Sequence, residues 1–225
     1  MIDEVRSTLG TVTDRLQQIL RTVRRDPDKS TVTKVDLKQL VTETMNTWQA
    51  LARDKWKLIM SSRLPDEPCI VDGDHSHLQQ AIENLIFNAR DATFEMRNYL
   101  REQARTSTLH DQNSRKQRLI EAASWRGEVQ LLLSHSGTSV ILEISDNGIG
   151  MSESVREQCL STHFTTKRDN ALYEGHSAGM GLGLSFVAVI LEHHHAKLEI
   201  ESEHYQGSRF RIHFLPASSP SSTSE

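Results

Sequence analysis

Four short stretches of the chain carry residue types suited to holding a phosphorylated ligand with a flat ring. They occur in the order ENLIFNARDA (83–92), DNGIGM (146–151), THFTTK (162–167) and GMGLGL (179–184). In the first stretch, Asn84 and Asn88 are one helical turn apart and share a face of the predicted helix. Each stretch alone is weakly specific, whereas all four in this order are not expected by chance.

The stretch GMGLGL directly precedes an apolar helical pattern, LSFVAVILEHHH. Gly179, Gly181 and Gly183 leave the backbone uncovered where this helix begins. Free N–H groups at a helix N-terminus attract phosphate through partial positive charge and hydrogen bonds. Close packing alone also explains such an entrance, and the stretch is neither a lysine-bearing phosphate loop nor a dinucleotide fingerprint. We predict that this helix holds a phosphate chain, with close packing as the alternative.

Asp146 ends a predicted strand and is followed by Gly148 and Gly150. A carboxylate at the edge of a sheet accepts a hydrogen bond from an exocyclic amine, and glycines let the backbone come close to a flat ligand. Taken alone, the stretch is explained equally well by a strand that ends in an Asn-Gly turn.

The elements that position these stretches follow from hydrophobic spacing and turn residues. Asp36 is the predicted N-cap of a helix that extends to about Arg53, and Asp74 or Ser76 opens the helix that carries the first stretch. Strands are predicted in KLIMSSRLP, PCIVDG, EVQLLLSH, SVILEISD, AKLEIESE and SRFRIHFL, the last four as two hairpins. The pattern predicts an α+β fold, a two-layer sandwich with helices on one face of a mixed, largely antiparallel sheet.

The two ends of the chain differ from this central domain, which is predicted at residues 31–216. Apolar residues recur at steps of three and four over residues 1–25, at Ile2, Val5, Leu9, Val12, Leu16, Ile19 and Val23. This spacing predicts a helix that packs on another helix or subunit, with packing on its own domain as the alternative. Pro27 ends it, so residues 1–30 form a separate unit. The serine-rich residues 217–225 are predicted to be disordered.

Composition excludes several classes of protein. The net charge of −4 gives no basic field for nucleic acid. No apolar run approaches the roughly 18 residues of a spanning helix, so we expect a cytoplasmic domain without membrane contact. Cys69 and Cys159 have no metal-type spacing and are expected to be reduced thiols.

Together, the four stretches resemble the boxes of the GHKL ATPase superfamily, over about residues 33–216. The resemblance is greatest to the catalytic ATP-binding domain of bacterial sensor histidine kinases, in which these stretches are the N box, first glycine box, F box and second glycine box. GSRF, from Gly207, resembles a weaker third glycine box, and NARDA is a form found among nitrogen-regulator-like kinases. The resemblance implies a Bergerat-type sandwich that binds ATP and Mg²⁺.

The resemblance also implies roles for individual residues. Asn88, helped by Asn84, would bind Mg²⁺, and Asp146 would accept a hydrogen bond from the adenine amine. Gly148 and Gly150 would admit the base. Gly179, Gly181, Gly183 and Leu184 would frame the phosphates, and Lys167 and His176 would lie in or beside a lid over them, at residues 165–180. The other residues expected to contact the nucleotide are Arg90, Asp91, Thr166 and Leu182. Asn84, Asn88 and Lys167 are the predicted catalytic residues.

Asn84 favours phosphotransfer over hydrolysis. Hydrolysing members of the superfamily carry a water-orienting glutamate at the position of Asn84, and the neighbouring Glu83 points about 100° away around the helix. The first histidine of the chain, His75, lies inside the ATP-binding domain. We therefore expect a fragment of a longer kinase that phosphorylates a histidine outside this chain, on a dimerisation hairpin whose second helix resembles residues 1–25. Its expected partners are that hairpin, a response regulator and a second subunit. The alternative is a nucleotide-dependent switch or an anti-sigma-type serine kinase.

Two further features are individual to this chain. Residues 94–128 exceed the family's usual length here by roughly 20 residues. This insertion is predicted to be helical and carries Arg97, Arg101, Arg105, Arg115, Lys116 and Arg118, which form either a solvated basic face or a docking surface. The consecutive histidines 193–195 point in different directions on a helix and cannot share a metal ion well. We predict instead that they end the helix, where their positive charge interacts favourably with the helix dipole.

Overall fold

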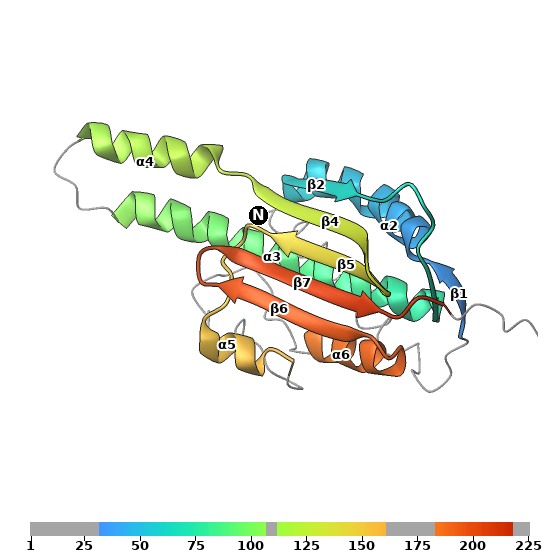
Figure 1. Ribbon diagram of the computed structural model, residues 1–225. Coiled ribbons are helices and arrows are strands. Elements are labelled where there is room, and N and C mark those ends of the chain that lie inside the picture. The colour runs from blue at the N-terminus through green and yellow to red at the C-terminus, as the bar shows by residue number, and fades with distance from the viewer. Residues whose placement is uncertain (1–31, 107–111, 161–182, 218–225) are drawn as a thin grey trace, which may run out of the picture.

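The computed structural model describes residues 32–106, 112–160 and 183–217 (Figure 1). Its helices are α2 (Leu37–Leu51), the π-helical segment η2 (Ala52–Trp56), α3 (His75–Thr106), α4 (Gln112–Ser124), α5 (Glu153–Gln158) and α6 (Gly183–His193). Its strands are β1 (Thr33–Asp36), β2 (Leu58–Arg63), β3 (Ile70–Gly73), β4 (Gly127–Ser136), β5 (Ser139–Asp146), β6 (Lys197–Glu203) and β7 (Gly207–Phe214). The predicted helix over residues 1–25 lies outside the described residues.

The main sheet has five strands in the order β2-β4-β5-β7-β6. β2 runs parallel to β4, and every other neighbouring pair is antiparallel. The two predicted hairpins, β4–β5 and β6–β7, are joined side by side by the pairing of β5 with β7. The predicted α+β class with a mixed, largely antiparallel sheet is confirmed.

The short strands β1, β2 and β3 do not pair in chain order. β2 and β3 follow each other in the chain, but β2 joins the main sheet while β3 pairs with β1. β1 is absent from the strands predicted from the sequence, because four residues with one buried valine, Val35, give no detectable alternation. Opposite Val35 in the ladder lies the buried Val71.

The core lies between the main sheet and the layer formed by α2, α3 and α6 (Figure 1). Alternate residues of the central strands face this layer, as expected for a sheet covered on one side. The inward set includes Val129, Leu131, Leu133, Val140, Leu142, Ile144, Phe210, Ile212 and Phe214, which pack with Leu78, Ile82, Leu85, Ile86, Val187, Ile190 and Leu191. Each of these side chains stabilises the fold by about 1.5–3 kcal/mol on burial.

Both long helices of the N-terminal half begin at an aspartate cap. The N–H of Lys38 donates to Asp36 Oδ1 at 2.9 Å, which confirms the predicted N-cap of α2. The N–H groups of Ser76 and His77 donate to Asp74 Oδ1 at 2.9 and 3.0 Å, so Asp74 is the residue that caps α3. These bonds satisfy N–H groups that have no partner within the helix.

Helix α3 is continuous for 32 residues, which corresponds to about 48 Å. The C-terminal part of α3 projects past the sheet together with α4 (Figure 1). The two helices pack antiparallel, and Ala104 and Ala122 are buried. The predicted insertion at residues 94–128 is therefore a helical hairpin, made by the end of α3 and by α4. Among the described residues, no helix has both the length and the apolar character needed to cross a bilayer.

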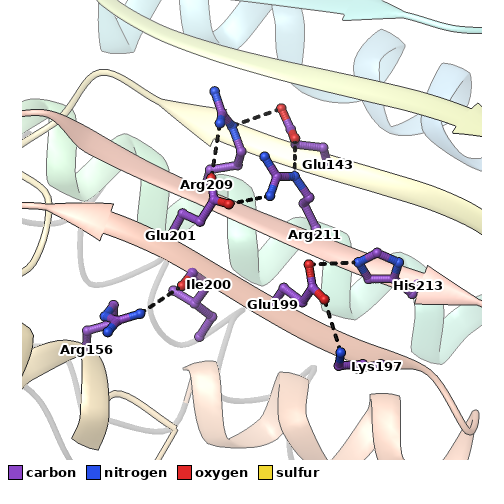
Figure 2. Close-up of polar contacts among 9 residues, drawn as sticks. All are labelled: Glu143, Arg156, Lys197, Glu199, Ile200, Glu201, Arg209, Arg211 and His213. Carbon is purple, nitrogen blue, oxygen red and sulfur yellow. Dashed lines mark hydrogen bonds and ion pairs between the residues drawn. The ribbon is translucent and has the colours of Figure 1, made fainter.

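The face of the sheet away from the helices carries a charged network (Figure 2). Glu143 of β5 accepts from Arg211 Nε at 2.7 Å and forms an ion pair with Arg209, whose Nε lies 3.2 Å from Oε1. Both arginines, which belong to β7, also pair with Glu201 of β6. The network therefore ties three adjacent strands together across their outer face.

We expect the Glu143→Gln substitution to lower the free energy of unfolding by about 1 kcal/mol at low salt, because it removes the charge that both arginines share. The side chain of Glu143 is only 15% exposed, so salt screens it incompletely, and the loss shrinks as ionic strength rises. Urea denaturation at two salt concentrations measures this. The matched control is Asp72→Asn, which affects the exposed pair with Lys34 and is expected to change stability little. A loss of the same size at both salt concentrations would contradict the electrostatic explanation.

Candidate nucleotide-binding site

Helix α3 presents two functional faces that differ in their neighbours. Asn84, Asn88 and Asp91 lie on one face at successive turns, as the spacing predicts. Asn84 is buried and Asn88 is half-buried. Glu83 and Phe87 occupy the other face, toward α2 and η2. The chain thus separates the amides from the neighbouring carboxylate.

The side chain of Asn88 lies beside the first residue of α6. A Cβ atom added to Gly183 would lie 3.6 Å from Asn88 Oδ1 and 3.7 Å from Nδ2, so the two segments approach within van der Waals contact. Asn88 Nδ2 is buried and has no hydrogen-bond partner among the described residues. A buried amide left in this state costs about 1–3 kcal/mol, which a bound polar group would recover. The position suits a ligand held between α3 and the N-terminus of α6.

Asp146 is the last residue of β5, and strand alternation places it on the same side as Leu142 and Ile144, toward the helices. Burial raises the pKa of its carboxyl group to about 7, opposed by hydrogen bonds from the N–H groups of Gly148 and Ser208. The first of these bonds is 2.8 Å long. A desolvated carboxylate of this kind gains from a ligand that donates an amine hydrogen bond.

Gly148 and Gly150 let the loop after Asp146 pack against other backbone. A Cβ on Gly148 would lie 2.5 Å from the carbonyl carbon of Ala92 in α3. Gly150 has φ of +65°, and a Cβ there would lie 2.0 Å from the carbonyl oxygen of Glu203. These contacts explain the need for glycine. The predicted contact of the two glycines with a base stays a prediction.

The charged neighbours of the amides already have partners. Arg90 pairs with Asp91, with Nη2 2.7 Å from Oδ1, and its guanidinium lies over the rings of Trp56 and Phe87 at 5.1 and 5.2 Å. Arg90 and Asp91 therefore neutralise each other. The roles predicted for them at the phosphates stay predictions.

Glu83 is directed away from the amides. It accepts hydrogen bonds from Trp48 Nε1 of α2 and from Gln79 Nε2, both at 3.2 Å. This agrees with the interpretation that Glu83 does not replace a water-orienting base at position 84.

Among the remaining predicted site residues, Leu184 is half-buried against the core. Thr166, Lys167, His176, Gly179, Gly181 and Leu182 lie outside the described residues. A cavity of about 580 Å³ does open in the described part, but it is lined mainly by outward residues of the sheet such as Gln130, Ser145 and Arg209. It opens on the face opposite to the helices, and Asp146 and Asn147 at the end of β5 also line it.

The prediction that histidines 193–195 add positive charge is wrong for His194. Helix α6 does end at His193, but the His194 ring lies between α6 and the start of α3. Its Nδ1 is 2.6 Å from the carbonyl oxygen of Ile190, and its Nε2 accepts from the N–H of Asp74 at 2.9 Å. Both nitrogens are thus used by the neutral tautomer, and burial lowers the pKa of His194 below its usual value.

This bonding predicts a loss of stability on acidification. The unfolded chain binds a proton at His194 near its usual pKa of 6.5, whereas the folded protein resists protonation, so stability is full above that pH and falls below it. We expect the unfolding free energy to decline less between pH 7 and pH 5 in His194→Gln than in the wild type. Thermal or urea unfolding across this range measures the slopes, and the exposed His75→Gln serves as control. Parallel curves for wild type and His194→Gln would contradict this assignment.

Known proteins are similar to this chain in sequence. Sporulation kinase B of Bacillus subtilis (strain 168) is 25% identical over 185 residues, covering 82% of this chain and 34% of that protein. The circadian input-output histidine kinase CikA of Synechococcus elongatus is 26% identical over 177 residues, covering 78% of this chain and 19% of that protein. This chain therefore spans about a third or less of the length of these relatives.

Solved structures give the same picture for the fold. The catalytic domain of histidine kinase ThkA superposes with a TM-score of 0.59 at 20% identity, over 83% of this chain and 97% of that one. Full-length ShkA in complex with AMPPNP superposes with a TM-score of 0.63 at 17% identity, over 93% of this chain and 37% of that one. Residues 73–219 match the family described as "Histidine kinase-, DNA gyrase B-, and HSP90-like ATPase". Because that match covers more than half of the sequence and includes Asn84, Asn88, Asp146 and Gly183, the chain belongs to this ATPase family.

Proposed function

We propose that this domain binds ATP with Mg²⁺ and transfers the γ-phosphate to a histidine outside this chain, as the catalytic domain of a two-component sensor kinase. The observation that carries the proposal is the position of Asn88. Its half-buried amide faces the first residue of α6, and Nδ2 has no partner among the described residues. In an ATPase of this family, such a position suits the phosphates and their metal ion.

Different residues of the site would bind the metal ion, the phosphates and the adenine ring. Asn88 Oδ1, with Asn84 one turn earlier, would hold Mg²⁺, which when bound neutralises charge on the phosphate oxygens. The N–H groups at the start of α6 attract phosphate, since this helix of 11 residues has its positive end there. Asp146 would orient the adenine ring by accepting from its amine.

Phosphotransfer is favoured over hydrolysis by the surroundings of Glu83. Hydrolysis needs a base within about 3 Å of the attacking water, whereas Glu83 is buried and bonded to Trp48 on the far side of α3. Asn84 supplies an amide, which accepts no proton at neutral pH. An acceptor side chain must then enter the site from elsewhere.

The partners of this reaction are a helix hairpin that carries the acceptor histidine and a response regulator that receives the phosphate. Residues 1–25 have the apolar spacing of a bundling helix and would form part of a dimer. The names of the relatives support this proposal, since sporulation kinase B and CikA are kinases of which this chain matches one part.

The test is phosphotransfer to a supplied acceptor. The chain would be incubated with Mg²⁺, ATP labelled at the γ-phosphate, and the acceptor hairpin of sporulation kinase B, with a hairpin lacking the histidine as control. We expect label on the intact hairpin that is lost in acid and retained in base. Acid-stable label would indicate a serine acceptor. Rapid phosphate release without any acceptor would contradict the proposal in favour of a hydrolysing switch.

A further inference from the structure

The loop that follows Asp146 is held at a junction of three segments: α3, the loop itself (residues 147–151) and the turn between β6 and β7. The N–H of Ile149 donates to the carbonyl oxygen of Ala92 in α3 at 3.0 Å. On the opposite side of the loop, the N–H of Tyr205 in the turn donates to the carbonyl oxygen of Ile149 at 2.6 Å. The N–H of Met151 donates to Ser202 Oγ at 2.8 Å. The position of the loop therefore depends on α3 and on the turn together.

The contacts within this junction leave little space. Gly207, the first residue of β7 after the turn, has φ of +86°, and a Cβ there would lie 2.0 Å from the carbonyl oxygen of Asp146. Tyr205 itself has φ of +69°, a conformation that non-glycine residues adopt rarely. Such a conformation persists only where surrounding contacts enforce it. A shift of the turn would therefore move the backbone at Asp146.

One aromatic pair joins the turn to α3 outside the backbone bonds. The rings of Tyr99 and Tyr205 stack with centroids 4.5 Å apart and an angle of 26° between their planes. A hydrogen bond with Tyr99 also raises the pKa of the Tyr205 phenol. Tyr99 lies two turns beyond Ala92, on the part of α3 that continues into the projecting hairpin. The extended helix thus contacts the same turn that holds the loop.

We propose that Tyr99 and Tyr205 are positioning residues for the nucleotide: their stacking fixes the turn, the turn fixes the loop, and the loop sets the place of the Asp146 carboxylate. The inference rests on the proposed role of Asp146 in binding adenine. It also assigns a function at the site to the start of the predicted insertion, since Tyr99 lies within residues 94–128. Neither tyrosine contacts the ligand in this mechanism.

The proposal predicts a loss that is specific to the base. Removal of the stack in Tyr99→Leu weakens ATP binding by about three- to tenfold, the range expected for an aromatic pair. Binding of Mg²⁺ with inorganic tripolyphosphate, which has no base, stays unchanged. The preference for ATP over GTP falls, and Tyr99→Phe, which keeps the stacked ring, restores most of it. Gln103→Ala, one turn further along the same helix and exposed, is the matched control and behaves as wild type.

Calorimetric titration of the full chain with the three ligands tests this, with Asp146→Asn measured in parallel and thermal unfolding recorded for each variant. Equal ATP affinity in wild type and Tyr99→Leu, with Asp146→Asn weakened, would overturn the inference and leave the proposed function intact. Equal losses for ATP and tripolyphosphate would overturn it too, since they indicate a general structural effect. No binding of ATP by the wild-type chain would contradict the proposed function and this inference together.

Discussion

Replacing Asn88 with alanine is expected to reduce Mg²⁺-dependent phosphotransfer by about 100-fold or more, because stabilisation by a bound metal ion is worth several kcal/mol. Nucleotide binding should be spared in part, since the adenine and the N-terminus of α6 remain in place. Stability should also persist. Asn88 Nδ2 makes no hydrogen bond among the described residues, so truncation removes no internal bond at that atom.

The measurement compares initial rates of acceptor labelling with and without Mg²⁺, together with thermal unfolding. Asn98→Ala, which lies further along α3, is the control and should keep wild-type rates. If the wild-type chain is equally active without any divalent ion, Asn88 is not a metal ligand. A large loss of stability in Asn88→Ala would instead show that the amide has a structural role.

Replacing Asp146 with asparagine is expected to weaken ATP binding by about 10- to 100-fold, the equivalent of a charge-assisted hydrogen bond of about 1.5–3 kcal/mol. An amide presents a donor as well as an acceptor to the ring edge, so it does not reproduce the carboxylate. Titration with a fluorescent ATP analogue measures the change. A variant that binds as tightly as the wild type would show that Asp146 does not recognise the base.

The same substitution should remove a pH dependence. Burial raises the pKa of Asp146 to about 7, and the amine of adenine needs the ionised form, so wild-type affinity rises from pH 6 to about pH 8. The effect of pH on stability has the opposite sign. The unfolded chain loses the proton of Asp146 near pH 3.8, whereas the folded protein keeps it up to about pH 7. The stabilisation that comes from this raised pKa is therefore lost as pH rises through 7. Asp146→Asn should bind with little pH dependence in this range.

The sequence was sufficient for the parts of the fold that depend on local patterns. Hydrophobic spacing predicted the helix that carries Asn84 and Asn88, the Asp36 cap marked the start of α2, and alternation identified the strands of both hairpins. These features depend on residues close together in the chain. The resemblance of the four stretches supplied the family, which the match over residues 73–219 confirms.

Features made by distant residues were missed for a physical reason. The partner of β3 is β1 rather than β2, and a strand of four residues carries too little pattern to reveal this. His194 looked like an exposed helix end, because its bond to Asp74 spans 120 positions. The stack of Tyr99 on Tyr205 likewise joins two segments that no local spacing connects.

The pairing of β5 with β7 has a consequence for the order in which the protein folds. The hairpins β4–β5 and β6–β7 are local, so we expect them to form early. β5 and β7 meet across a long intervening segment, so we expect their pairing to form later. Asp146 lies opposite Ser208 at the end of this late ladder. The proposed adenine site at Asp146 would therefore be completed only when the two halves of the sheet join, and we expect ATP to slow unfolding of the joined sheet without speeding the formation of either hairpin.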